Sequence, residues 1–308
     1  MPDAATRKRL VICLGCTVVD NVMELDEIPK TPIKVMASRR ARRGGGPAAT
    51  GAVACAELNI GAELWSWLGQ DPEGAFLRAS LQRHGVDVTH TPLREGIDTN
   101  SAFVLVDRDG ERMIVGHGGF PPQHGADQLP LDRVANADSV LVDGTWPAGA
   151  AAVLEAARAA GIPAVYDAES RDPETLADLA RRASVPVFSE DGFHRITGGA
   201  IPGAASCAAL SSRLDASVIG VTLGARGSLW WLDDGLTHVP ALPVSVVDTT
   251  GAGDVFHGAL AAGLAEHMPI LAAARFATAA ASLKCALGAG WEGMPDRAAV
   301  ERALRQLA

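Results

Sequence analysis

The chain has 308 residues, of which 48% are hydrophobic and 20% charged, and this composition is typical of a folded domain with a sizeable core. A formal net charge of −9 argues against general nucleic-acid binding, although a nucleotide would need only a local positive potential. The apolar stretches are interrupted by polar residues, and residues 1–10 lack the apolar segment of a signal peptide, so we expect a cytoplasmic protein without a membrane-spanning helix. Five scattered cysteines favour small buried thiols over a disulfide framework.

The first third of the chain predicts a strand, a polar segment and a helix of small residues. Residues 10–14 form a short continuous apolar run, which is typical of a strand covered on both faces. Residues 22–43 are more polar, contain two prolines and favour exposed strands and loops. Gly44, Gly45 and Gly46 then lead into a helix that we expect to end near residue 58.

A β-hairpin interrupts the chain near residue 108. An Asp-Gly pair at 109–110 lies between two β-type runs, 101–106 and 111–115, and such a pair is a strong hairpin signal. We place this hairpin in a small β lid, together with residues 22–43.

Strands and helices alternate over most of the remaining chain. We expect strands at 64–68, 139–142, 164–167, 185–188 and 218–223. We expect helices at 71–84, 148–160, 173–182, 204–214, 254–266, 270–287 and 297–307, and a second hairpin at 228–239. The alternation predicts a doubly wound, mostly parallel α/β sheet with helices on both faces. We treat 1–308 as one domain, with a lid contributed by about 20–43 and 97–118.

Residues 246–260 form the most informative stretch. Two apolar residues resembling the end of a buried strand are followed by a turn with Gly251 and Gly253 and then by a helical pattern from Asp254. Backbone N–H groups at a helix N-terminus attract anions, and an acid beside them can accept a proton from a hydroxyl that attacks a phosphate. The simpler alternative is an ordinary strand–helix turn in which Asp254 is the N-cap.

Three motifs occur in a recognisable order. Gly45-Gly46 opens a helix, the segment 221–227 (VTLGARG) follows a buried strand, and the segment 248–254 (DTTGAGD) comes last. Together they resemble the ribokinase-like (PfkB) carbohydrate kinase family over nearly the whole chain. The resemblance implies a doubly wound α/β domain with a small β lid. It also implies transfer of the γ-phosphoryl group of ATP, with Mg²⁺, to a hydroxyl of a sugar, nucleoside or related small molecule.

The resemblance gives roles to the last two motifs. It implies that Asp254 is the catalytic base and that three neighbours supply the backbone anion hole: Gly251, Ala252 and Gly253. It places three residues on the nucleotide side: Thr222, Gly224 and Gly227. Asp248 and Thr250 match positions that in some members hold a monovalent cation such as K⁺.

Further residues are implied on the acceptor side and at the metal. Asp20 aligns with the acid that binds acceptor hydroxyls, and Gly45 and Gly46 let the backbone approach the acceptor. Thr50 stands where many members have asparagine, and its hydroxyl can still contact the acceptor. The family's Asn-x-x-Glu motif appears as residues 189–192 (SEDG), which leaves Glu190, or Asp191 beside it, to reach the water shell of Mg²⁺.

A narrower resemblance concerns the acceptor. The glycine run, the 246–260 stretch and residues 283–285 are similar to the bacterial 6-deoxy-6-sulfofructose kinase branch. Lys34 matches a basic residue that faces the sulfonate there, but Gly116 and Thr145 replace two further sulfonate-binding residues. A ketose, a sulfofructose-like sugar or another acidic sugar therefore remain candidate acceptors, with a primary hydroxyl as the expected target.

Two other functions are compatible with the same fold. A nucleoside kinase would need stacking residues in its lid, and Phe103 is the one aromatic residue in the predicted lid hairpin. A non-catalytic sugar or nucleotide sensor would not need the intact DTTGAGD segment. Because exposed lid strands in such folds pair between protomers, we expect a homodimer through the lid.

Overall fold

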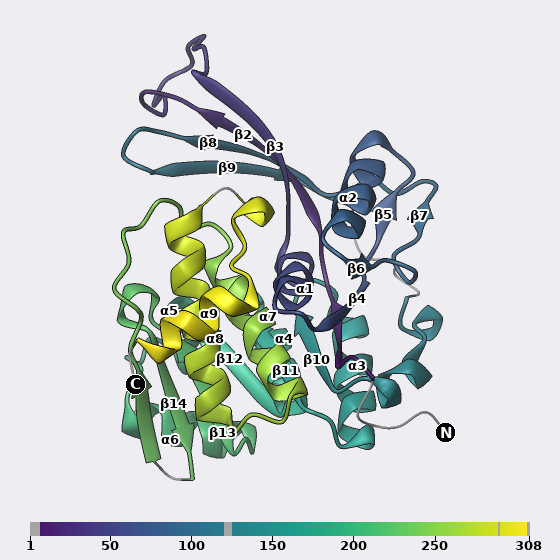
Figure 1. Ribbon diagram of the computed structural model, residues 1–308, viewed down its shortest axis with the longest axis vertical. Helices are drawn as coiled ribbons and strands as arrows, with labels where there is room; N and C mark the ends of the chain where they lie inside the picture. The colour runs from purple at the N-terminus through teal and green to yellow at the C-terminus, as the bar shows by residue number, and fades with distance from the viewer. Residues whose placement is uncertain (1–6, 120–124, 234, 289, 307–308) are drawn as a thin grey trace.

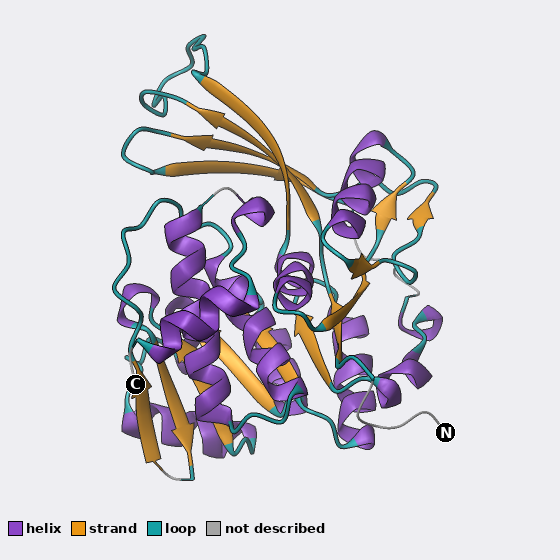
Figure 2. Ribbon diagram, viewed as in Figure 1, coloured by secondary structure: helices purple, strands orange, loops and turns teal. Residues whose placement is uncertain are grey.

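The computed structural model describes residues 7–119, 125–233, 235–288 and 290–306. A nine-stranded sheet forms the body of the molecule, and a separate four-stranded sheet projects from one end of it (Figure 1). The strands of the body are covered by helices, whereas the projecting sheet is not (Figure 2). We call the four-stranded sheet the lid.

The main sheet is mostly parallel. Its strand order is β15-β14-β13-β12-β11-β10-β1-β4-β6, and neighbours from β13 to β6 run parallel, whereas β14 and β15 form an antiparallel hairpin at one edge. The strands are β1 (Leu10–Leu14), β4 (Gly61–Trp65), β6 (Val86–Asp87), β10 (Ser139–Asp143), β11 (Ala164–Ala168), β12 (Val185–Ser189), β13 (Val218–Thr222), β14 (Ser228–Leu232) and β15 (Gly235–Val239).

Helices form one core on each face of this sheet. One core includes side chains of α1 (Pro47–Glu57), α2 (Pro72–Arg83), α7 (Ala252–Ala265), α8 (Ile270–Leu287) and α9 (Arg297–Arg305). The other includes side chains of α3 (Pro147–Ala160), α4 (Pro173–Arg182), α5 (Glu190–Thr197) and α6 (Ala204–Leu214). The predicted doubly wound α/β class is confirmed.

The lid consists of four strands, two from residues 18–45 and two from the predicted hairpin. Its order is β3-β2-β8-β9, with β2 (Val18–Glu24), β3 (Arg39–Gly45), β8 (Ser101–Val106) and β9 (Arg112–His117). Strand β3 consists of four arginines, one alanine and two glycines and has little intrinsic β-propensity, so its pairing with β2 decides its conformation. A further small sheet pairs β5 (Leu68–Gly69) with β7 (Leu93–Arg94) beside the lid.

Two local predictions are wrong. The strand expected at 64–68 lies at Gly61–Trp65, because Gly61, Ala62 and the buried Glu63 hide its start from an apolar-run search. Val246 and Val247 do not end a buried strand, since their side chains are 61% and 70% exposed. The N–H of Val247 donates to the Cys285 carbonyl at 2.8 Å instead of joining a sheet.

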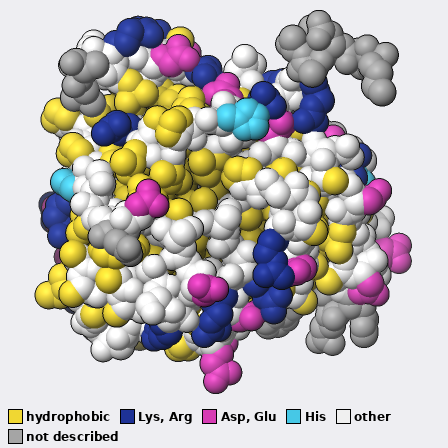
Figure 3. Space-filling model, turned by 90° about the horizontal axis from the view of Figure 1, so that it is seen from below, with side chains coloured by type: hydrophobic (Ala, Val, Ile, Leu, Met, Phe, Trp, Pro, Cys, Tyr) yellow, Lys and Arg dark blue, Asp and Glu magenta, His cyan; other side chains and the backbone are white. Residues whose placement is uncertain are grey.

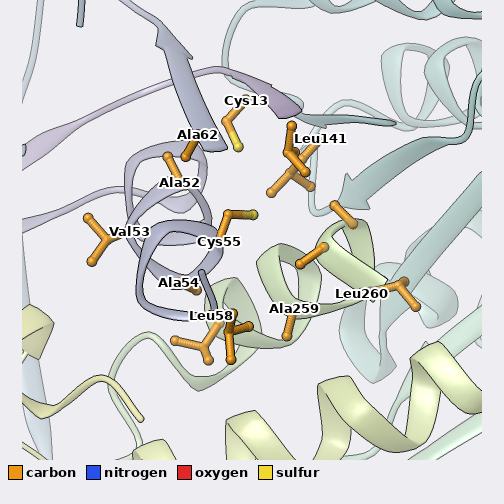
Figure 4. Close-up of a cluster of buried hydrophobic side chains, with 14 of the residues drawn as sticks. Cys13, Ala52, Val53, Ala54, Cys55, Leu58, Ala62, Leu141, Ala259 and Leu260 are labelled. Atoms are coloured by element: carbon orange, nitrogen blue, oxygen red, sulfur yellow. The ribbon is translucent and has the colours of Figure 1, made fainter. Parts of the chain in front are cut away.

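Helices α1 and α7 approach each other unusually closely through small residues. A Cβ at Gly258 would lie 2.4 Å from the Gly51 carbonyl oxygen, and the Cys55 thiol lies 3.2 Å from the Gly258 oxygen. Small side chains of both helices line this contact, with Cys13 and Leu141 beside it (Figure 4). The contact fixes the start of α7 beside α1, because a Cβ at Gly51 would lie only 3.6 Å from the Asp254 carbonyl oxygen.

Helix α8 is long and apolar enough to cross a membrane by length and composition, but half of it is buried inside the protein. A core helix of a soluble protein has the same properties, and α8 contributes many alanines to the core shared with α7.

The end of the molecule away from the lid shows apolar side chains near its centre and charged side chains mostly towards its rim (Figure 3).

Candidate active site

Two cavities flank the turn that precedes α7. The first, which we call the lid cavity, lies between the lid and the body and is lined in part by Asp20, Gly45, Gly46, Thr50, Gly251 and Asp254. The second, which we call the helix cavity, is lined in part by Thr222, Gly224, Gly227, Thr249, Ala252 and Gly253. The structure therefore places the predicted acceptor-side residues Asp20, Gly45, Gly46 and Thr50 in one cavity and the predicted nucleotide-side residues in another.

The turn alternates between these two cavities. Asp248, Thr250 and Asp254 line the lid cavity. Thr249, Ala252 and Gly253 line the helix cavity. The N-cap of α7 is Gly251 in the left-handed conformation, at φ 75°, with no side-chain cap, so the alternative in which Asp254 is the N-cap is wrong. The positive end of the helix lies between the cavities, where a phosphoryl group passing from one to the other would sit.

Asp254 has the electrostatics expected of a base. Burial and the nearby carboxylate of Asp167 raise the pKa of Asp254 to about 7, while His257 acts in the opposite direction. A carboxyl group with a pKa near the working pH can both hold and release a proton, which suits general base catalysis.

Sequence reasoning missed the buried pair beneath Asp254. His257 Nδ1 lies 3.5 Å from the Asp167 Oδ2, and both side chains are almost fully buried. Burial lowers the pKa of His257 and raises the pKa of Asp167 well above its usual value. The one signal in the sequence was the spacing of Asp254 and His257, which lie three residues apart and so share a helix face.

Asp20 lies on β2 and faces the lid cavity. Burial raises its pKa to about 6, although Arg43 opposes the shift. A Cβ at Gly45 would lie 2.4 Å from the Asp20 Oδ2, so the absence of a side chain there makes room for this carboxylate. Gly46 has φ 96°, and a Cβ there would lie 2.6 Å from the Cys16 carbonyl. Glycine is therefore required at both positions, because a side chain at either one would clash with its neighbours.

Thr50 is paired with a tryptophan that the sequence did not suggest. Trp291 Nε1 donates to the Thr50 Oγ1 at 3.0 Å, and both side chains are buried. The indole also lines the lid cavity. The Thr50 hydroxyl accepts from the indole and keeps its own proton available for a ligand.

A third cavity, which we call the outer cavity, adjoins Asp20 and Gly46 and contains the two positions that depart from the sulfofructose kinase pattern. Gly116 and Thr145 line it, and the described residues of its lining include neither lysine nor arginine. Lys34 lies exposed in the loop between β2 and β3 and lines none of the three cavities. The structure thus does not bring Lys34 together with Gly116 and Thr145.

Asp248 and Thr250 form a local hydrogen-bonded turn. Asp248 Oδ1 accepts from the Thr250 N–H at 2.9 Å and from the Thr250 hydroxyl at 2.6 Å. Arg112 of the lid donates to the same oxygen at 2.9 Å. Burial acts to raise the pKa of Asp248, but these bonds and the nearby arginine outweigh it and keep the pKa below its usual value.

The residues predicted near Mg²⁺ lie apart from the cavities. Glu190 begins α5 and is paired with Arg226, and it lines neither the lid cavity nor the helix cavity. A Cβ at Gly192 would lie 2.5 Å from the Ala168 carbonyl oxygen, so this backbone has little room for a second acid. Within the described part of the chain, no group of three or more His, Cys, Asp or Glu side chains could hold a metal.

Comparisons with known proteins show the family of the chain. The chain matches the pfkB family carbohydrate kinase model over residues 8–296. An ATP-dependent ribose-1-phosphate kinase of Halopiger xanaduensis is 28% identical over 80% of this chain and 81% of its own length. A solved structure from Agrobacterium tumefaciens, provisionally called a ribokinase, is 33% identical with a TM-score of 0.92, covering 98% of this chain and 99% of that chain.

A second solved structure shows a ligand-bound relative. Arabidopsis thaliana ribokinase complexed with ribose and ATP superimposes with a TM-score of 0.85 at 26% identity, covering 97% of this chain and 99% of that chain. The family match spans both sides of the turn before α7 and the whole lid. The chain therefore belongs to the pfkB family of carbohydrate kinases, and it is a phosphotransferase with an alcohol group as acceptor.

Proposed function

We propose that this protein transfers the γ-phosphoryl group of ATP to a primary hydroxyl of a small neutral sugar, with a ketose as the first candidate. The observation that carries the proposal is the alternation of the turn before α7 between the lid and helix cavities. One helix N-terminus then faces both substrates, as direct phosphoryl transfer requires.

The lid cavity supports the acceptor half of this reaction. Asp20 orients acceptor hydroxyls, and the bare backbone at Gly45 and Gly46 allows close approach. Asp254 accepts the proton of the attacking hydroxyl, and the backbone N–H groups of residues 251–254 stabilise the charge that spreads over the phosphoryl oxygens. The lid above excludes water and so limits the hydrolysis of ATP.

The helix cavity supports the nucleotide half. Its lining is dominated by small and apolar residues of the loop 241–246 and of α8, which suits a flat purine ring. Gly227 has φ 89°, and a Cβ there would lie 2.1 Å from the Val239 carbonyl, so the turn beside the cavity depends on glycine. The ATP bound by the Arabidopsis relative supports the assignment of this cavity to the same nucleotide.

Mg²⁺ is proposed to arrive with the nucleotide. The lack of a three-carboxylate cluster among the described residues fits an ion held mainly by phosphates and water. Bound Mg²⁺ would neutralise charge on the phosphates. Glu190 remains the proposed contact to its water shell, although its carboxylate is paired with Arg226 in this structure.

The outer cavity, which contains the two positions that depart from the sulfofructose kinase pattern, favours a neutral acceptor, although four arginines border the lid cavity beside it: Arg39, Arg43, Arg108 and Arg112. A fixed anion is bound most strongly by charge-assisted hydrogen bonds, and the described lining of this cavity offers no lysine or arginine. Lys34, the residue expected to face a sulfonate, is exposed in a loop outside it. A nucleoside is also disfavoured, because Phe103 lies on the outer face of the lid and is 51% exposed.

An ADP-release assay with ATP, Mg²⁺ and a panel of acceptors tests the proposal. We expect turnover with a neutral ketose such as fructose or with a neutral pentose, and weaker turnover with 6-deoxy-6-sulfofructose and adenosine. Asp20→Ala should raise the KM for the sugar more than the KM for ATP, because Asp20 lines the lid cavity and does not line the helix cavity. Sugar binding without ADP release for any acceptor would instead indicate a sensor.

We further propose that the protein forms a homodimer through the outer face of the lid. The register pairs Phe103 with Val115 and Leu105 with Met113, so these side chains share one face of the β8–β9 pair. Three of them are large, apolar and exposed: Phe103 at 51%, Met113 at 44% and Val115 at 61%. Exposed apolar side chains gathered on one face of a sheet are typical of a surface that another chain covers.

Light scattering coupled to gel filtration tests the dimer. The wild-type protein should elute at twice the chain mass, and the double variant Phe103→Lys/Val115→Lys should elute as a monomer with an unchanged far-UV spectrum. The matched control Leu93→Lys alters an exposed apolar residue outside the lid and should remain dimeric. A monomeric wild-type protein would refute the proposal.

A further inference from the structure

Helix α8 carries a lysine whose charge is enclosed in the protein. The Lys284 side chain is 1% exposed, although lysine is almost never fully buried without a partner. Its Nζ donates to the Gly288 carbonyl oxygen at 3.1 Å, and the residue borders the lid cavity. A buried ammonium needs compensating negative charge, so the charged groups around Lys284 should indicate its role.

The charged groups around Lys284 centre on Asp248. Burial lowers the pKa of Lys284, the Asp248 carboxylate and the Cys285 thiol act to raise it, and Arg43 and Arg112 act to lower it. The N–H groups of Val247 and Asp248 donate to the Cys285 carbonyl at 2.8 and 3.1 Å. The loop before the anion hole is therefore fastened to the C-terminal end of α8, next to the lysine.

The same place is where the family resemblance implies a monovalent cation. Such an ion needs several free oxygen ligands, yet Asp248 Oδ1 already accepts from Arg112 and Thr250. Arg43 lies 3.7 Å from the Asp248 Oδ2. The Gly288 carbonyl accepts from Lys284 itself. The two arginine side chains at this carboxylate, together with the Lys284 ammonium on the Gly288 carbonyl, would repel a further cation, so these residues do not fit the ion.

We propose that the Lys284 ammonium takes the place of the monovalent cation, so that this kinase needs no K⁺. Lys284 acts as a positioning residue: it fastens residues 246–250 to the end of α8 and adds positive potential beside the N-terminus of α7. The kinetic part of this inference rests on the proposed function, whereas the structural part does not.

The test compares wild-type protein with Lys284→Met in tetramethylammonium, sodium, potassium and ammonium chloride at one ionic strength. The wild-type Tm and kcat should be the same in all four salts. In tetramethylammonium, Lys284→Met should lose about 2–4 °C in Tm and about tenfold in kcat, with little change in the KM for the sugar. Potassium or ammonium should restore at least half of each loss, because removing the ammonium lowers the positive charge there and frees the Gly288 carbonyl oxygen for a small cation.

A control and a second variant keep the result interpretable. Arg275→Ala removes an exposed positive charge from the same helix and should respond to no cation. If Lys284→Met does not fold, the wild-type salt series and Lys284→Arg decide, and Lys284→Arg should remain independent of potassium.

Three outcomes would overturn the inference. These are stimulation of the wild-type enzyme by potassium, a Lys284→Met variant that no cation rescues, and a raised KM for the sugar without any cation effect, which would place Lys284 on the acceptor. The Tm measurements need no substrate. Cation rescue of Tm alongside a failed acceptor screen would therefore reject the proposed function and leave this inference standing.

Discussion

Asp254→Asn is expected to lower kcat by about 10²–10⁴-fold while the protein stays folded and binds its sugar. The amide has almost the same shape as the carboxylate but cannot accept the proton of the attacking hydroxyl. ADP release measures the loss, and a sugar-induced shift in Tm measures the binding. The control Asp132→Asn changes an exposed acid far from the turn and should keep full activity. An Asp254→Asn enzyme with nearly full turnover would exclude Asp254 as the base.

The pH dependence checks the same assignment independently. Because the folded-state pKa of Asp254 is raised to about 7, wild-type kcat should rise with pH through that value and then level off. The same shift lowers stability as pH rises from about 4 to 7, because the folded protein then holds a proton that the unfolded chain has lost. The Tm of Asp254→Asn should therefore exceed that of the wild type at pH 8, whereas the two values should be nearly equal at pH 4. The residual kcat of the variant should not rise with pH through 7.

Gly258→Val is expected to lower the free energy of unfolding by about 3 kcal/mol or more, with loss of activity in the fraction that folds. A Cβ at position 258 would lie 2.4 Å from the Gly51 carbonyl oxygen and 2.8 Å from the Gly51 Cα. Both atoms belong to the backbone of α1, so no side chain can move aside and α7 must shift. The start of α7, with its anion hole, would move as well.

Urea unfolding followed by circular dichroism measures this destabilisation. Gly116→Ala provides the matched control, because this glycine lies on the exposed strand β9 and no atom lies within 4 Å of a new Cβ there. The control should unfold within about 0.5 kcal/mol of the wild type. A Gly258→Val protein as stable as the control would show that α1 and α7 separate at little energetic expense.

The sequence predicted the fold because its alternation of strands and helices is regular. Strands β10 to β13 are short, apolar and buried, and each is followed by a helix or a turn. Parallel order and helices on both faces then follow from the handedness of the connections. The lid was harder to predict, because β3 consists mainly of arginines and glycines and takes its shape from β2. The intrinsic conformational preferences of residues do not predict a strand whose conformation is set by pairing with a distant segment.

The candidate site could be predicted only where its residues lie in a motif. Asp254 directly follows its glycine turn, so a single segment of the sequence predicted both the helix N-terminus and the acid. Trp291 could not be found this way, because it reaches Thr50 from a position 241 residues further along the chain. The enclosure of Lys284 was equally hidden, since only the three-dimensional structure places Asp248 and the end of α8 side by side.

The alternating turn before α7 has a consequence for how such enzymes diversify. The linings of the lid cavity and the helix cavity share no residue, although they meet at consecutive positions of one turn. Mutations that retune the choice of sugar can therefore accumulate on one set of side chains without disturbing the other. A lineage built on this turn can inherit its phosphate donor unchanged while it explores new acceptors.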